Sequence, residues 1–180
     1  MPHVELVQPS TLHRDSYRSL VAEFLGCAET LVPFVLSFDH SDFDAMLTRL
    51  TDCARGIGLP QRFVPHSTFW LIEHNDEVVG VTNIRHELTP ALRIEGGNIG
   101  YGIRPSARGR GLGTVALRLA LGRARDLGLS EVLVTCGKVN IASARIIRRN
   151  GGVLQSEEYL ESRGEIVQRY AIANGSDVRA

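Results

Sequence analysis

Apolar residues recur at helical spacing in four stretches of the chain, and at alternate positions or in short runs in seven others. The first pattern predicts helices over residues 11–25, 39–54, 112–127 and 140–150. The second predicts strands over residues 3–7, 67–73, 77–87, 98–104, 131–136, 153–159 and 165–172. Early helices are thus followed by an antiparallel group of strands and then by a strand–helix–strand–helix unit. This order predicts an α/β or α+β fold with helices on both faces of a sheet.

Turn and capping residues mark the boundaries of these elements. Ser10 is suited to cap the first helix, and Gly26 is suited to end it. Residues 55–66 contain two glycines and two prolines and predict a loop, and residues 88–93 predict a second loop. The tripeptide at 74–76 predicts the turn of a hairpin.

Gly100 and Gly102 interrupt the apolar alternation of the strand predicted over residues 98–104. A glycine inside a strand commonly marks a bulge or a place where something else comes close to the backbone. We therefore expect one of these two features in this strand.

The composition is that of an ordinary globular protein, and the 180 residues are predicted to form one domain, 1–180. Because the formal net charge is zero, no global field favours nucleic acid or a membrane as a partner. No signal peptide or membrane-spanning run is visible. The three cysteines are widely spaced and include no CxxC pair, so we expect neither disulfides nor a metal site, and a reducing, cytoplasmic location.

Arginines are concentrated in one part of the chain. Six of them lie close together in sequence: Arg104, Arg108, Arg110, Arg118, Arg123 and Arg125. Such a group is either a solvated helix face or a local positive field for an anionic ligand. Nucleic acid is the less favoured ligand, because no stacking aromatic residues are interleaved with these arginines.

The segment Arg108-Gly109-Arg110-Gly111-Leu112-Gly113 lies between a predicted strand and a predicted helix. Its glycines let the backbone pass close to a ligand, and the first N–H groups of the helix lack partners within the helix. Together with the helix dipole, these features predict a pyrophosphate-binding turn. A flexible glycine-rich connection is the structural alternative.

Two common phosphate-binding motifs do not fit this segment. A P-loop requires Lys-Ser or Lys-Thr after its last glycine, whereas Thr114-Val115 follows Gly113 here. A dinucleotide-binding fingerprint requires a third glycine at the position of Thr114 and an acidic residue at the end of the next strand, but Glu131 begins that strand.

The pattern Arg108-x-x-Gly111-x-Gly113, after a strand ending in Ile-Arg-Pro and before an amphipathic helix, resembles the acyl-CoA signature of the GNAT superfamily of N-acetyltransferases. Residues 132–136 resemble the family's next strand. Asn140-x-x-Ser143, followed by residues 150–152, resembles its Asn-containing helix and closing turn. The resemblance covers residues 77–160 and implies a mostly antiparallel central sheet of about six to seven strands, with acetyl-CoA as cosubstrate and no metal.

The resemblance also implies roles for particular residues in binding CoA. Backbone N–H groups of the glycine-rich turn would bind the pyrophosphate, the end of the preceding strand would pair with the pantetheine arm, and the Asn-containing helix would face that arm. The residues so implied are Ile103, Arg104, Arg108, Gly109, Arg110, Gly111, Leu112, Gly113, Thr114, Asn140 and Ser143. Asn140 and Ser143 are equally suited to cap the first turn of their helix.

Acetyl transfer to an amine requires a base, because an alkylamine with a pKa of ~10.4 is mostly protonated at neutral pH. Candidates on or beside the central strands are Glu95, Tyr101 and His86, each of which also fits a surface, packing or loop-edge role. The family often places a tyrosine general acid about seven residues after the Asn. This chain has Ile147 there, so a tyrosine acid at that point is not expected.

Three functions remain open from the sequence. The first is an acetyl-CoA-dependent N-acetyltransferase that acts by direct transfer in a ternary complex. Its acceptor, a small-molecule or peptide amine, would lie near His66 and Ser67, between the early helices and the loops at 55–66 and 88–97. The second is a non-catalytic acyl-CoA-binding or sensing module, and the third is a nucleotide-phosphate binder of another fold. A homodimer is the expected assembly.

Overall fold

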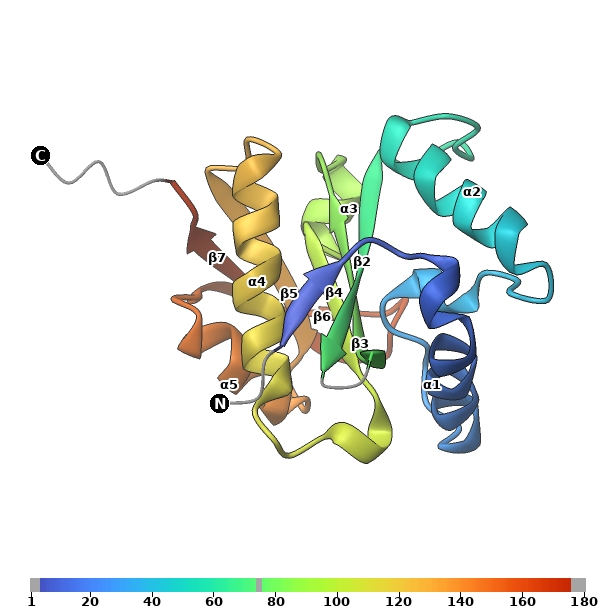
Figure 1. The fold of residues 1–180 in the computed structure, drawn as a ribbon. Helices are drawn as coiled ribbons and strands as arrows, with labels where there is room; N and C mark the ends of the chain where they lie inside the picture. The colour runs from blue at the N-terminus through green and yellow to red at the C-terminus, as the bar shows by residue number, and fades with distance from the viewer. Residues whose placement is uncertain (1–3, 74–75, 176–180) are drawn as a thin grey trace, which may run out of the picture.

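The computed structural model describes residues 4–73 and 76–175, which form two antiparallel sheets (Figure 1). The strand order is β1-β2-β3-β4 in the first sheet and β5-β7-β6 in the second. The strands are β1 (Glu5–Val7), β2 (His66–Glu73), β3 (Glu77–Arg85), β4 (Ile99–Ile103), β5 (Glu131–Gly137), β6 (Val153–Leu160) and β7 (Glu165–Ala173). The predicted α/β fold with a mostly antiparallel arrangement of about seven strands is confirmed.

Helices cover both faces of the first sheet. Figure 1 shows α1 and α2 on one side and α4 with α5 on the other. The α-helices are α1 (Arg14–Gly26), α2 (Phe43–Arg55), α3 (Pro90–Ile94), α4 (Leu112–Asp126) and α5 (Ile141–Arg149). The short 3-10 helices are η1 (Thr11–His13), η2 (Phe34–Ser37) and η4 (Pro105–Ala107). No helix among the described residues is both long and apolar enough to span a bilayer.

A separate apolar core lies on each face. On the α1 and α2 side, Trp70 is fully buried and stacks on Tyr17 with 4.5 Å between ring centroids. On the other side, Leu117 of α4 and Ile147 of α5 are fully buried against the strands. Each such side chain contributes about 1.5–3 kcal/mol by leaving water, so both cores hold the sheet in place.

The two sheets meet at one end of β4. Gly97 forms an isolated bridge with Val134, and the Asn98 N–H donates to the Leu133 carbonyl at 2.7 Å. A Cβ atom at Gly97 would collide with the Leu133 carbonyl, and its φ of +66° also favours glycine. Past this point β4 and β5 form no ladder within the described residues. The unpaired edges of β4 and β5 are called the split below.

The glycines of β4 do not form a bulge. The register between β3 and β4 is unbroken from Gly80 to Ile84. Instead, the segment after α1 lies directly on these glycines: a Cβ at Gly102 would collide with the Val32 carbonyl, and one at Gly100 would lie 3.3 Å from Pro33 Cβ. Of the two predicted alternatives, a close approach is confirmed and a bulge is wrong.

Two predicted boundaries also differ. Ser10 makes no side-chain capping bond, and the first helix begins as the 3-10 turn η1 before α1 starts at Arg14. The loop predicted at 88–93 contains most of the short helix α3, because the Thr89 hydroxyl accepts the Leu92 N–H at 3.2 Å and caps it. The first two residues of the turn predicted at 74–76 lie outside the described residues.

Candidate functional site

Residues Arg108–Gly113, here called the cradle, connect η4 to α4. Gly109 and Gly111 have φ values of +78° and +81°, which residues with a side chain rarely adopt. Gly111 is the N-cap of α4 and offers no side chain to satisfy the first turn. The two glycines therefore let the chain turn sharply and leave the helix N-terminus uncovered.

The N–H groups of the cradle are available to a ligand. Among the described residues, none accepts a hydrogen bond from the N–H groups of residues 109–113, whereas the Thr114 N–H already donates to the Gly111 carbonyl at 3.0 Å. Several free N–H donors at the positive end of a 15-residue helix form an anion site. Thr114 is thus the one predicted pyrophosphate donor whose N–H is occupied.

Gly113 also serves helix packing. A Cβ there would lie 2.6 Å from Cδ1 of Ile146, a residue of α5. The Asn150 side chain donates to the Thr114 carbonyl at 3.2 Å and ties the end of α5 to the start of α4. The signature glycine at 113 therefore allows α5 to sit against the cradle.

Both cradle arginines pair with carboxylates. Arg108 binds Glu29 through two hydrogen bonds of 2.7 Å and donates from Nε to the Ile103 carbonyl at 3.1 Å. The hydrogen bonds from Arg108 hold the pKa of Glu29 below its usual value. Arg110 pairs with the buried carboxylate of Glu73 at 2.6 Å. The charge of each cradle arginine is thus balanced by a carboxylate from another part of the chain.

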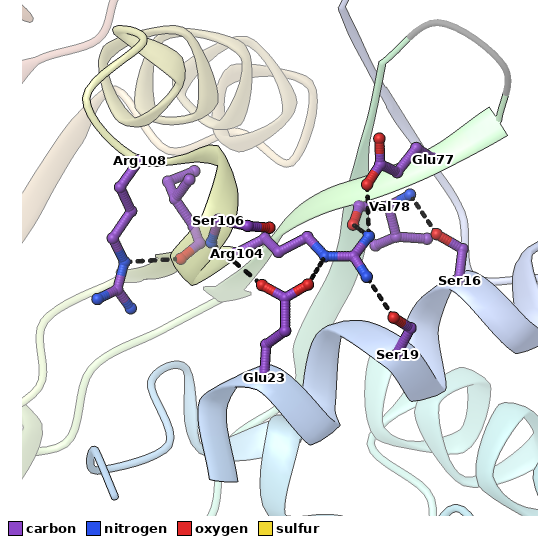
Figure 2. A network of polar contacts seen from close by, with 9 residues as sticks. Ser16, Ser19, Glu23, Glu77, Val78, Arg104, Ser106 and Arg108 are labelled. Carbon is purple, nitrogen blue, oxygen red and sulfur yellow. Dashed lines mark hydrogen bonds and ion pairs between the residues drawn. The ribbon is translucent and has the colours of Figure 1, made fainter. Parts of the chain in front are cut away.

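Arg104 points away from the cradle and into α1 (Figure 2). Its buried guanidinium donates to Glu23 and Glu77, both at 2.7 Å, and to the Ser19 hydroxyl. Glu23 also accepts the Ser106 N–H at 3.1 Å; burial opposes ionisation of Glu23, but these hydrogen bonds lower its pKa. The backbone N–H of Arg104 donates to the Val79 carbonyl at 2.9 Å and is therefore already occupied, whereas the sequence predicted that this backbone would contact the pantetheine arm.

The neighbouring backbone groups of β4 face the split. Alternate residues of a strand direct their N–H and C=O groups to opposite sides. The N–H of Arg104 donates to Val79 of β3, so the N–H and C=O groups of Tyr101 and Ile103 are directed to the opposite side, toward β5. In the part of the chain that the structure describes, β5 does not pair with them, so Ile103 retains a free N–H on the unpaired edge.

Two hydroxyl groups meet between β4 and α5. Tyr101 Oη lies 2.8 Å from Ser143 Oγ, and burial raises the pKa of Tyr101 above its usual value. The Asn140 side chain accepts the Ser143 N–H at 3.0 Å, which is the N-cap arrangement. Ile147 is fully buried in the core and offers no proton. The hydroxyl pair therefore consists of Tyr101 from β4 and Ser143 from α5.

The three candidate bases bond to three different elements. His86 Nε2 lies 2.8 Å from Ser67 Oγ, and burial lowers the pKa of His86. Glu95 accepts from the Ser162 hydroxyl at 3.2 Å and lies 3.8 Å from Arg163, in the turn between β6 and β7. The Tyr101 hydroxyl bonds to the Ser143 hydroxyl of α5. Among the hydrogen bonds of the described residues, none joins two of these three side chains.

A cavity of about 720 Å³ lies on the α1 and α2 side of the first sheet. Aromatic and aliphatic side chains of the 34–38 and 57–63 segments line part of it, α2 contributes mostly polar side chains, and His66 lines it at the start of β2. We call it the acceptor pocket. Its wall at Phe34 continues into Val32 and Pro33, which lie on β4. Sequence patterns indicated His66 but not Phe34 or Arg49, because no periodic signal relates η2 to α2.

Comparison with protein families matches residues 13–153 to the acetyltransferase (GNAT) domain. Since the match spans most of the chain, the protein belongs to the GNAT acetyltransferase family, and the predicted acyltransferase class is confirmed at that level. No curated protein matches the chain in sequence.

Solved structures share the fold at low identity. One is the microcin C7 self-immunity acetyltransferase MccE in complex with acetyl-CoA and AMP, with a TM-score of 0.67, 14% identity, and coverage of 94% of this chain and 92% of that chain. The acetyltransferase from Salmonella typhimurium that modifies the N-terminal serine of a 50S ribosomal subunit protein has a TM-score of 0.67, 20% identity and 94% coverage of both chains. A chimera of the Vibrio cholerae spermidine N-acetyltransferase SpeG with hSSAT has a TM-score of 0.62, 13% identity and 96% coverage of both. At these identities the likeness establishes the fold alone.

Proposed function

We propose that this protein is an acetyl-CoA-dependent N-acetyltransferase that transfers the acetyl group directly to a primary amine within a ternary complex. The observation that carries the proposal is the placement of two ligand regions on opposite faces of one sheet. The cradle lies at the start of α4, and the acceptor pocket lies against α2. This arrangement supports the binding of both substrates at once, which direct transfer without a covalent acyl-enzyme requires.

The cradle fits a CoA pyrophosphate in chemistry. Free N–H groups of residues 109–113 would hold the phosphate oxygens, and the free N–H of Ile103 would bond to the pantetheine arm. Arg108 and Arg110 would supply charge if they exchange their carboxylate partners for phosphate. When bound, acetyl-CoA supplies the thioester carbonyl that the amine attacks. A solved relative by fold, MccE, is described in complex with acetyl-CoA.

The remaining chemistry would be done by side chains near the split. Tyr101 and Ser143 form a neutral hydroxyl pair, and the raised pKa of Tyr101 suits it to donate a hydrogen bond to a leaving thiolate rather than to act as a base. His86 is the better base candidate, because its lowered pKa keeps the ring neutral at neutral pH. Glu95, paired with Arg163, is the second candidate.

The competing function is a non-catalytic acyl-CoA-binding module, which the buried Ile147 at the family's tyrosine position favours. Release of free CoA thiol from acetyl-CoA with a broad panel of amines separates the two. We expect turnover that falls at least ~10-fold in a Tyr101→Phe, Ser143→Ala double variant with unchanged CoA affinity. Tight acetyl-CoA binding without turnover of any amine would support the binding module instead. Thermal protection by ATP or NAD but not by CoA would contradict both.

A further inference from the structure

His66 is a buried histidine with a hydrogen-bond partner at one ring nitrogen, Nδ1, and none at the other, Nε2, among the described residues. Its side chain is almost completely buried, and its Nδ1 lies 2.9 Å from Asn83 Nδ2. Among the described residues, its Nε2 has no hydrogen-bond partner. A buried polar atom without a partner costs about 1–3 kcal/mol, and His66 lines the pocket, so a ligand group that bonds to Nε2 would remove this cost.

The neighbours of Asn83 determine which ring nitrogen of His66 carries the proton. The same Asn83 Nδ2 lies 3.3 Å from the Ser67 carbonyl and 3.0 Å from the Thr68 hydroxyl. A carbonyl oxygen can only accept, so this atom of Asn83 is the amide nitrogen and donates. His66 Nδ1 is therefore the acceptor, and the proton of the neutral ring is on Nε2. The ring nitrogen without a partner is thus a donor.

The other groups around His66 reinforce this polarity. Arg49 of α2 lines the pocket over the Phe38 ring at 3.8 Å, and Arg85 of β3 lies over the Phe34 ring at 5.4 Å. Together with His86, these are the charged or titratable groups that act on His66. Asp52 is the one carboxylate among the lining residues. The pocket thus combines aromatic walls with hydrogen-bond donors and a positive field.

We propose that His66 is a specificity-determining residue of the acceptor pocket, where its Nε2–H donates to a carbonyl or carboxylate oxygen on an amine with an apolar or aromatic body. This inference rests on the proposed acetyltransferase function and names its substrate class. The volume of the cavity is in the range of small-molecule sites. A polyamine without oxygen acceptors would leave Nε2 unsatisfied and would meet the field of Arg49 and Arg85, so it is disfavoured.

The test compares matched amines that differ in the oxygen acceptor. Phenethylamine carries none, phenylalaninamide carries a carbonyl, phenylalanine carries a carboxylate, and spermidine is a polycation. For the wild-type protein we expect kcat/KM for phenylalaninamide or phenylalanine to exceed that for phenethylamine by about 10- to 100-fold. Which of the two is preferred distinguishes a peptide-type carbonyl from a free carboxylate.

Variants at position 66 then assign the preference to its N–H. His66→Phe should reduce the ratio between phenylalaninamide and phenethylamine to within ~3-fold, while His66→Gln, which keeps an N–H donor, should restore part of it. Comparison of ratios between variants cancels the intrinsic difference in amine basicity. The matched control is His13→Phe, which replaces another buried histidine, one that lies outside the pocket against Trp70. It should leave the ratio unchanged.

Calorimetric binding of the same amines in the presence of CoA gives a second readout that does not need turnover. A His66-dependent preference in binding without turnover would retain this inference and contradict the proposed catalytic function. The inference would be overturned if wild type, His66→Phe and His66→Gln showed the same preference for the oxygen-bearing amines, in turnover or in binding. Preferred binding of spermidine would also overturn it.

Discussion

The cradle and the acceptor pocket are built in different ways. The cradle is six consecutive residues, and its donors are backbone N–H groups exposed by two glycines with positive φ. The pocket is assembled from side chains of η2, α2, a loop and β2, which are far apart in the sequence. The donors of the cradle depend on backbone conformation, which its glycines allow, whereas the pocket depends on the side chain at each lining position. On the proposed function, recognition of the cofactor and choice of the acceptor would thus be separated in the chain.

The strongest way to break the cradle is to add a side chain at a positive φ. Gly111→Val should lower CoA affinity by at least ~100-fold, measured by calorimetry, because valine cannot adopt the φ of +81° and the turn must rearrange. The space around Gly111 is open, so backbone strain rather than a clash is the cause. Gly122→Ala, within α4 and with open space, is the control and should bind CoA normally. Equal affinity in Gly111→Val and wild type would show that the phosphates bind elsewhere.

The Arg104 network joins the end of β4 to α1 and β3 and concerns stability. Arg104→Met leaves Glu23 and Glu77 without their partner and empties the buried guanidinium site, so we expect a loss of roughly 3 kcal/mol in free energy of unfolding. The carboxylates are partly exposed, which limits the loss. Urea denaturation measures it. The control Arg14→Met breaks the exposed ion pair with Asp44 and should lower the free energy of unfolding by no more than about 1 kcal/mol. Similar losses in both variants would contradict a special contribution of the Arg104 network to stability.

The pocket should make the protein sensitive to acid. Burial and neighbouring cations lower the pKa of His66 from 6.5 to about 4. Between these values the unfolded chain binds a proton that the folded protein does not, so this contribution to stability is complete above pH 6.5 and is lost as pH falls toward 4. It amounts to roughly 2–3 kcal/mol. His66→Gln should unfold with a correspondingly flatter dependence on pH in denaturant titrations at pH 7 and 4.5. An unchanged slope in His66→Gln would exclude His66 as its source.

The smallest expected effect concerns the acid beside the cradle. Glu29→Gln frees Arg108 from its ion pair, and the additional positive field should tighten CoA binding by about two- to fivefold at low salt and by less at high salt. The matched control is Glu157→Gln on β6, which removes a carboxylate from its ion pair with Lys138. This variant should leave CoA binding unchanged. Weaker binding in Glu29→Gln would mean that the pair is needed to hold Arg108 in position.

Periodicity and glycine placement predicted most of the fold, because helices and strands follow from apolar spacing that a single sequence displays. The cradle could be predicted for the same reason: Arg108–Gly113 are adjacent, and their function lies in the backbone. The role of Gly100 and Gly102 could not be derived from the sequence alone, since the segment that lies on them, Val32 and Pro33, is about seventy residues away in the sequence.

Side-chain partners were the other part that the sequence did not reveal. Arg104 is adjacent to the cradle in sequence, yet its guanidinium turns to Glu23 and Glu77 on other elements. The orphaned nitrogen of His66 depends on the amide of Asn83 in the next strand. Such pairings arise from the register of β2, β3 and β4, and one sequence without the fold does not specify them.

The single junction of the two sheets has a consequence for the acyl donor. Because Gly97 lies against Leu133 and no ladder follows within the described strands, the distance between the β4 and β5 edges is set at one place. A Cβ at position 97 would collide with the Leu133 carbonyl, so a larger residue there must displace the junction. If acetyl-CoA binds at the split, as proposed above, the acyl chains that fit should then depend on position 97, and libraries at positions 97 and 133 test this with donors longer than acetyl.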